Sequence, residues 1–384
     1  MSKAVLPPVF PGERGRHELS GSGIVIEGLP KVSLHDHLDG GVRPSTVVEL
    51  ALASGVSLPE SDPAALGEWV LANSNSGSLE KYLQAFGVTL SVMQTAANLK
   101  RIASEFVTDL VNDGVIYAEI RWAPELHTEM GLTTGEAVAA VQSGIDSAVA
   151  AALDAGKNIR AGQILCAMRQ NDNGVEIARL ALENRHEGVV GFDIAGPEKG
   201  YPASRMADAF RLLDDEWFPR TVHAGEADGL ESIAGALIVG RALRLGHGIR
   251  ISDDIEFSNS GDSEVVEIGE LAGWVRDREI ALEICPTSNV HTKAFSRFGD
   301  GIEKHPFDLL YRLGFRVTVS TDNRLMSGTT LSREIASLAE TFGYGLEDIL
   351  EWQLNAAGAA FVSVDEREEL IETLLTAYGK LLPA

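Results

Sequence analysis

Apolar runs typical of β-strands alternate with stretches of helical periodicity along most of this chain. Eight such runs are separated by helical patterns. This alternation predicts parallel strands joined by crossover helices, and eight repeats are typical of a (β/α)8 TIM barrel. An open doubly wound α/β sheet is the competing architecture. The eight predicted strands are residues 32–37, 115–122, 159–168 and 189–194, the runs that end at His223 and at His247, and residues 280–284 and 315–321.

Four of these runs end in residues that can bind a metal or move a proton. The first ends in His35 and His37, the fifth in His223 and the sixth in His247, while Asp322 follows the eighth. Alternate residues of a strand face the same side, so His35 and His37 should project together. Catalytic side chains of a barrel gather at the C-terminal strand ends. In an open sheet such residues would gather at one switch point. Metal-binding and acid–base residues at the ends of strands one, five, six and eight therefore favour the barrel.

Other segments extend the predicted barrel. We expect a helix at residues 44–53, an irregular polar stretch at 58–78, a helical block at 79–112 interrupted near Thr95, and added helices at 331–382. The fold class is thus an α/β barrel with extra helices after strand one and at the C-terminus. Apolar residues of the insertion would form either a lid over a ligand or helix core, namely Trp69, Leu71, Leu79, Tyr82 and Phe86.

Composition limits the partners and the compartment. The chain has 384 residues, of which 45% are hydrophobic and 23% charged, an ordinary globular balance. Its net charge of −24 disfavours nucleic acid and multiply phosphorylated substrates. Residues 1–22, with several prolines and charges, are predicted to be a loosely ordered lead-in, and residues 23–384 a single domain.

The cysteine content indicates a reducing environment. Only two cysteines are present, Cys166 and Cys285, both within apolar strand-like runs that suit buried thiols. The sequence contains no apolar stretch long enough to span a bilayer and no apolar signal core near its start. We expect a cytoplasmic protein without membrane partners, and the oligomeric state stays open.

The strand-end residues form a suitable ligand set for Zn²⁺, which accepts nitrogen and oxygen donors. We assign His35, His37, His223 and Asp322 to one zinc ion per chain, with a fifth position for water. Zinc lowers the pKa of bound water towards neutrality and so supplies a nucleophile.

Two further residues provide acid–base groups. His247 would orient the hydroxide or accept its proton, and Glu226 would give a proton to the substrate from the loop beyond the fifth strand. Ser288 and Asn289 either contact substrate or close a turn.

The remaining histidines are predicted to be structural. His17, His186 and His291 are expected at the surface or in loops, and His305 as a helix cap or a support for the site. His127-Thr128-Glu129 matches the H-x-E of cytidine-type zinc deaminases, but the paired P-C-x-x-C is missing from the sequence.

Taken together, the motifs resemble those of adenosine deaminases within the amidohydrolase superfamily. The resemblance runs from about residue 29 to about residue 361. It is carried by His35-Asp36-His37-Leu38-Asp39-Gly40, His223-Ala224-Gly225-Glu226, Gly246-His247-Gly248 and Ser320-Thr321-Asp322-Asn323.

This resemblance implies an activity and a set of contacts. Adenosine and 2'-deoxyadenosine would be hydrolysed to inosine and 2'-deoxyinosine plus ammonia, a step of purine salvage. Glu226 would protonate purine N1, and His247 would steady the hydroxide that attacks C6. Asp39 would bind a ribose hydroxyl, the Gly196 amide would bind purine N3, and the ligand His37 would also border the substrate.

The chain departs from the family pattern at two positions. Asn323 stands where many members have a second aspartate that contacts purine N7, and an amide can donate to N7 without titrating. Gly196-Pro197-Glu198 replaces the common Gly-Asp-Glu, which leaves the contacts near that loop open.

Related activities can be ranked from the same residues. A binuclear site usually needs a lysine on strand four, and residues 189–196 contain none. Adenine deaminases tend to carry glutamate where Asp39 stands, so a nucleoside substrate fits better than a free base. AMP deaminases need basic residues for the phosphate, and the net charge of −24 argues against that activity. Aminodeoxyfutalosine deaminase is the main alternative. A silent nucleoside-binding barrel would lack Glu226 or a ligand, and the sequence retains all of them.

Overall fold

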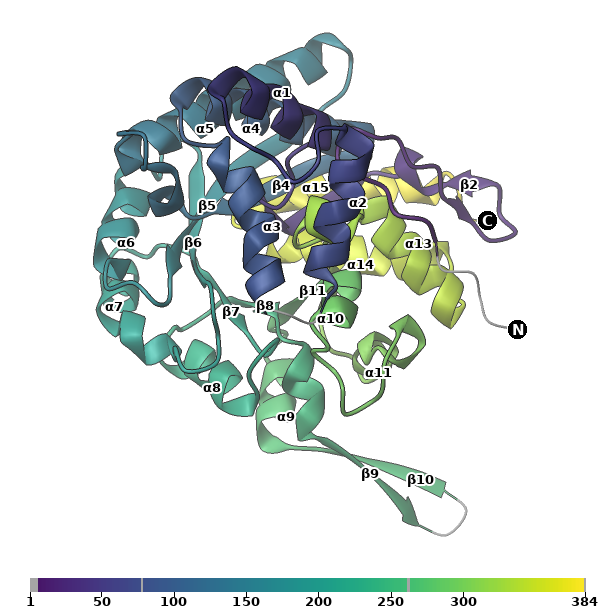
Figure 1. The fold of residues 1–384 in the computed structure, drawn as a ribbon. Coiled ribbons are helices and arrows are strands. Elements are labelled where there is room, and N and C mark those ends of the chain that lie inside the picture. The colour runs from purple at the N-terminus through teal and green to yellow at the C-terminus, as the bar shows by residue number, and fades with distance from the viewer. Residues whose placement is uncertain (1–5, 77–78, 261–262, 383–384) are drawn as a thin grey trace.

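The protein is described by a computed structural model that covers residues 6–76, 79–260 and 263–382. Two four-stranded parallel sheets curve into one barrel, in the orders β3-β4-β5-β6 and β7-β8-β11-β12 (Figure 1). The barrel strands are β3 (Lys31–His37), β4 (Val115–Trp122), β5 (Arg160–Met168), β6 (Val189–Ala195), β7 (Thr221–Ala224), β8 (Arg244–His247), β11 (Ala281–Ile284) and β12 (Val317–Val319).

Backbone contacts close the barrel on both sides. Asp36 bridges Asp322 in parallel, since the His37 amide donates to the Asp322 carbonyl at 2.7 Å and the Asp322 amide to the His35 carbonyl at 3.0 Å. On the other side Phe192 bridges Arg220. The predicted TIM barrel is therefore confirmed, and each predicted strand lies within a few residues of an observed one.

Helices form a ring outside the strands (Figure 1). Local sequence begins several of them: the Thr95 side chain caps α4 (Ala96–Asn112), which explains the predicted break, and Thr133 with Glu136 forms a capping box on α5 (Thr134–Asp154). The other helices that follow barrel strands are α6 (Gly174–Glu183), α7 (Ala207–Asp215), α8 (Leu230–Ile238), α9 (Glu270–Asp277), α10 (Pro286–His291), α11 (Phe307–Arg312) and α12 (Arg324–Ser327).

The helices added to the barrel, apart from α2, lie where helices were expected. They are α1 (Pro44–Ser54), α2 (Pro63–Ser74) and α3 (Leu79–Ser91) after β3, and α13 (Leu331–Phe342), α14 (Leu346–Ala359) and α15 (Val364–Gly379) at the C-terminus.

Residues 58–78 were predicted to be irregular, and this prediction was wrong for Pro63–Ser74, which form α2. The Asp62 side chain accepts the Ala65 amide at 3.0 Å, Pro63 takes the first turn, and the helix buries Leu66 and Val70. Residues 77–78 lie outside the described residues. Helix α2 contacts α12, which directly follows Asp322 and Asn323, so it covers the C-terminal end of the barrel.

The structure places three of the five apolar residues for which the sequence left lid and helix core open. Trp69, Leu71 and Phe86 are partly buried and pack against the main core. The side chains of Leu79 and Tyr82 lie outside the described residues.

Residues 6–22 of the expected lead-in pack on the barrel. Arg333 of α13 donates from Nε to the Pro7 carbonyl at 2.8 Å and from Nη2 to the Leu6 carbonyl at 2.7 Å. His17, predicted at the surface or in a loop, lies in the loop before β1 but is buried, and its Nδ1 lies 2.6 Å from Glu27 Oε1. Because Arg333 is distant in sequence, composition alone predicted looser order.

Between β8 and α9 the chain forms a hairpin that the sequence interpretation missed. Strands β9 (Ile255–Ser260) and β10 (Ser263–Ile268) pair antiparallel and extend away from the barrel (Figure 1). A smaller antiparallel pair joins β1 (Glu18–Leu19) and β2 (Ile24–Val25). Among the described residues, no helix combines the length and the apolar character needed to cross a membrane.

Candidate active site

Five predicted side chains meet at the C-terminal end of the barrel. His35 and His37 come from the end of β3, His223 from β7, His247 from β8, and Asp322 from the turn after β12. His35 Nε2 and His37 Nε2 each lie 3.4 Å from Asp322 Oδ1, and His37 Nε2 lies 3.3 Å from His223 Nε2. The predicted convergence of the two β3 histidines is therefore confirmed.

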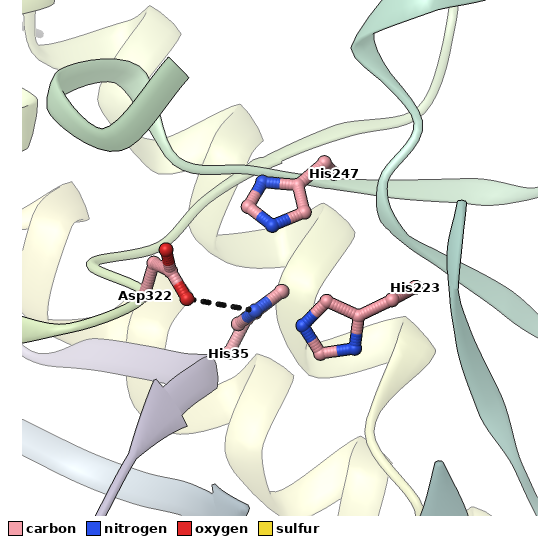
Figure 2. Close-up of side chains that lie close together, drawn as sticks. All are labelled: His35, His223, His247 and Asp322. Carbon is pink, nitrogen blue, oxygen red and sulfur yellow. Dashed lines mark ion pairs between the residues drawn. The ribbon is translucent and has the colours of Figure 1, made fainter. Parts of the chain in front are cut away.

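Four of these side chains form a compact potential metal site. Ligand atoms of His35, His223, His247 and Asp322 all lie within 4.8 Å of one another (Figure 2). Burial lowers the pKa of His35 to about 4, and the neighbouring Arg121 adds to the shift, so this imidazole is neutral and able to coordinate. His37 stands outside this tightest group, but it contacts two of its members.

Two buried carboxylates orient the histidine rings. Glu283 Oε2 lies 3.2 Å from His35 Nδ1, and Asp193 Oδ2 lies 2.7 Å from His223 Nδ1. Holding Nδ1 in this way turns Nε2 toward the metal position and raises the basicity of the ligand. Burial lowers the pKa of His223, but the Asp193 carboxylate outweighs it and raises the pKa.

Arginines inside the barrel hold those carboxylates in turn. Arg121 donates to Asp193 at 2.8 Å and to Glu283 at 2.8 Å, and Arg244 donates from Nε to Glu283 at 2.6 Å and from Nη2 to Glu119. All five side chains are buried. Sequence reasoning missed them, although charged residues within otherwise apolar strands were a visible signal.

Asp322 and His247 are fixed by residues that follow β11. Ser288 Oγ donates to Asp322 Oδ2 at 2.7 Å, and Asn289 Nδ2 donates to His247 Nδ1 at 3.0 Å. Asp322 and His247 have φ angles of 61° and 63°, which non-glycine residues rarely adopt. Ser288 and Asn289 therefore position other site residues.

Glu226 lies beside His247 at the mouth of the cluster. Its Oε2 is 3.5 Å from His247 Nε2, and Thr292 Oγ1 donates to its Oε1 at 3.1 Å. Burial raises the pKa of Glu226, while His247 opposes the shift. A carboxyl group with a raised pKa is suited to give a proton. Thr292 was not identified from the sequence.

The remaining predicted residues, Asp39, Gly196 and Asn323, follow β3, β6 and β12 at the same end of the barrel. Asp39 is buried, and burial raises its pKa to about 6. Among the described residues, none donates a hydrogen bond to Asp39 Oδ1. A Cβ atom on Gly40 would lie 1.9 Å from Asn323 Oδ1, so glycine is needed beneath Asn323. Gly196 has a φ of 91°, which also favours glycine.

The other histidines stand apart from the cluster. His127 is buried with Nδ1 3.0 Å from the Met93 carbonyl, and His186 is exposed. His305 Nδ1 accepts the Phe307 amide at 3.1 Å at the start of α11, as predicted for a cap. Asp36 faces away from the cluster and pairs with Arg324 at 2.8 Å.

Comparison with known proteins identifies the family to which the chain belongs. The adenosine deaminase family profile matches residues 30–377, a range that contains every candidate site residue. The chain belongs to the adenosine deaminase family. The predicted resemblance is therefore confirmed.

Members of the family from bacteria are similar over most of their length. The chain is 51% identical over 351 residues to adenosine deaminase 1 of Streptomyces coelicolor, covering 91% of this chain and 87% of that protein. It is 50% identical over 351 residues to the adenosine deaminase of Mycobacterium marinum, covering 91% and 95%.

A solved structure agrees in fold. A zinc-bound amidohydrolase from Burkholderia ambifaria superposes with a TM-score of 0.79 at 24% identity, over 97% of this chain and 96% of that one. At this identity the likeness concerns the barrel and its added helices.

Proposed function

We propose that this adenosine deaminase family member hydrolyses adenosine and 2'-deoxyadenosine to inosine and 2'-deoxyinosine plus ammonia, a step of purine salvage. The observation that carries the proposal is the pairing of Glu226 with the His/Asp cluster, 3.5 Å from His247. A proton donor beside a potential metal site is what hydrolytic deamination of a purine needs.

We propose one Zn²⁺ per chain, held by His35, His37, His223 and Asp322. The neutral His35 ring and the carboxylates on Nδ1 of His35 and His223 support this assignment. His247 is better suited to catalysis than to ligation, because its Nδ1 is bonded to Asn289 and its Nε2 faces Glu226. Bound zinc would supply Lewis-acid activation of water at neutral pH.

The protein's own groups have distinct roles in the proposed reaction. Protonated Glu226 gives its proton to purine N1 while C6 is attacked, which makes the ring a better electrophile. His247 stabilises the tetrahedral centre and passes a proton toward the departing amine. As the C6–N bond breaks and ammonia leaves, the hydroxyl proton at C6 passes to the Glu226 carboxylate. The carbonyl of inosine thereby forms, the proton donor is restored and one water is consumed.

Three residues are proposed to select the nucleoside. Asp39, with a free Oδ1 and a raised pKa, would bind a ribose hydroxyl. The Gly196 amide would bind purine N3, and the Asn323 amide would donate to N7. His37 borders the same space and would also limit where the purine ring lies.

The remaining expectations about the protein stay proposals. We propose a cytoplasmic enzyme, which the free and buried Cys166 and Cys285 support, and one hydrolase domain over residues 23–384. Small nucleosides are its proposed partners, without nucleic acid or membrane.

Loss of the adenosine absorbance tests the function directly. The purified protein should convert adenosine and 2'-deoxyadenosine rapidly, should lose activity on prolonged chelation and should regain it with added zinc. Elemental analysis should find about one zinc per chain in the wild type and much less in His35→Ala. Turnover of adenine or aminodeoxyfutalosine with no turnover of adenosine would contradict the proposed substrate.

A further inference from the structure

The loop that carries Glu226 is held by one buried carboxylate from a different strand end. Glu198, in the loop after β6, accepts four consecutive backbone amides of the loop after β7. Its Oε1 accepts from Gly225 at 2.6 Å, and its Oε2 accepts from Glu226 at 3.1 Å, from Ala227 at 2.7 Å and from Asp228 at 3.0 Å.

The surroundings keep this carboxylate in place. Glu198 is only 7% exposed. Burial raises the pKa of Glu198, but hydrogen bonds from Ser232 and the loop amides, with the charge of Arg169, outweigh it and lower the pKa. The group therefore stays ionised at neutral pH and accepts hydrogen bonds only, which suits four converging N–H groups.

The loop itself has little freedom to adopt another path. Gly225 has a φ of 74°, and a Cβ atom there would lie 2.6 Å from Ile233 Cδ1. Arg169 also donates to the His223 carbonyl, so the segment is held at a second point. The Glu226 side chain then reaches His247 and Thr292 from a backbone that Glu198 positions.

We propose that Glu198 is a positioning residue for proton transfer, acting through the backbone of the Glu226 loop and without touching the substrate. This inference rests on the proposed function of Glu226. It assigns a role to the third residue of Gly196-Pro197-Glu198, the segment in which this chain departs from the family pattern.

The steady-state test compares kcat with KM. Glu198→Ala should lower kcat by about 10- to 100-fold with KM within about threefold and zinc content unchanged, because the misplaced donor affects the chemical step. Glu198→Gln places an amide NH₂ group, which cannot accept hydrogen bonds, next to the loop amides and should lower kcat by about tenfold. This variant provides the test if Glu198→Ala does not fold. Asp113→Asn is the matched control, since this buried carboxylate accepts the Ser332 amide at the opposite end of the barrel.

A double-mutant cycle separates positioning from general stability. In a Glu226→Gln background, Glu198→Ala should change the residual kcat by less than about threefold, because the donor it positions is already gone. Equal losses in both backgrounds, or a rise in KM with kcat unchanged, would overturn the inference.

Hydrogen exchange gives a readout that does not depend on turnover. The amides of residues 225–228 should exchange faster in Glu198→Gln than in wild type, whereas Asp113→Asn should leave them unchanged. Unchanged exchange in Glu198→Gln would overturn the positioning role. If the wild type does not convert adenosine, the proposed function and the catalytic part of this inference are both overturned. If the wild type is active and the Glu198 variants are equally active, only this inference is overturned.

Discussion

At the scale of single residues, His35, His247 and Asp322 of the candidate site are each oriented by a second side chain. Glu283 holds His35, Asn289 holds His247 and Ser288 holds Asp322. Rings and carboxylates fixed in this way are preorganised, so the site needs little rearrangement when a substrate binds.

Glu226→Gln should reduce kcat by about 10²-fold or more while substrate affinity changes little, since the amide keeps the shape but has no acidic proton. Steady-state kinetics with adenosine and zinc analysis on the same sample measure this. Glu231→Gln, an exposed carboxylate on the neighbouring helix α8, is the matched control. Normal turnover by Glu226→Gln would remove Glu226 as the proton donor.

Asn289→Ala should lower kcat by about 10- to 100-fold with zinc retained, because His247 loses the bond that orients its ring. Asn355→Ala removes a side-chain bond to the Val317 carbonyl instead and should leave kcat near the wild-type value. Loss of zinc from Asn289→Ala would argue that His247 is a metal ligand.

At the scale of elements, the barrel strands carry charge as well as apolar core. Alternate residues Glu119 and Arg121 of β4 face the interior, where they meet Asp193 of β6, Arg244 of β8 and Glu283 of β11. This interior network links the stability of the barrel to the orientation of the site histidines.

Arg121→Met should destabilise the protein by about 3–5 kcal/mol, because it removes the buried positive charge that Asp193 and Glu283 share. Urea unfolding measures the change in the free energy of unfolding. Arg160→Met, which breaks partly exposed pairs with Glu366 and Glu369, should cost at most about 1 kcal/mol. Similar losses for both variants would contradict a special role of the interior network.

At the scale of the whole molecule, buried neutral histidines outside the site should make stability depend on pH. Burial lowers the pKa of His305 to about 3 and that of His127 to about 4. A histidine in the unfolded chain has a pKa near 6.5, so below that pH the unfolded state binds more protons than the folded state. The free energy of unfolding therefore decreases as the pH is lowered from 6.5 to the folded-state pKa.

His305→Asn should flatten this dependence between pH 6.5 and 4 by up to about 1.4 kcal/mol per pH unit, because an asparagine keeps a cap acceptor without titrating. Urea unfolding at several pH values measures the slope. The exposed His186→Asn should leave it unchanged. A slope equal to that of wild type would show that His305 does not titrate on unfolding.

The sequence by itself determined the barrel and the main site residues, because both depend on local patterns. Strand periodicity placed His35 and His37 on one face, and parallel order brought His223, His247 and Asp322 to the same end. These features need only the alternation of strands and helices.

Only the tertiary structure decided which groups support that site and how the additions pack. The carboxylates of Asp193 and Glu283 contact histidines on distant strands, and Glu198 reaches amides of another loop. The hydrogen bonds from Arg333 to the Leu6 and Pro7 carbonyls likewise join segments more than 300 residues apart. A local pattern can mark a charged residue within an apolar strand, but its partner depends on the tertiary structure.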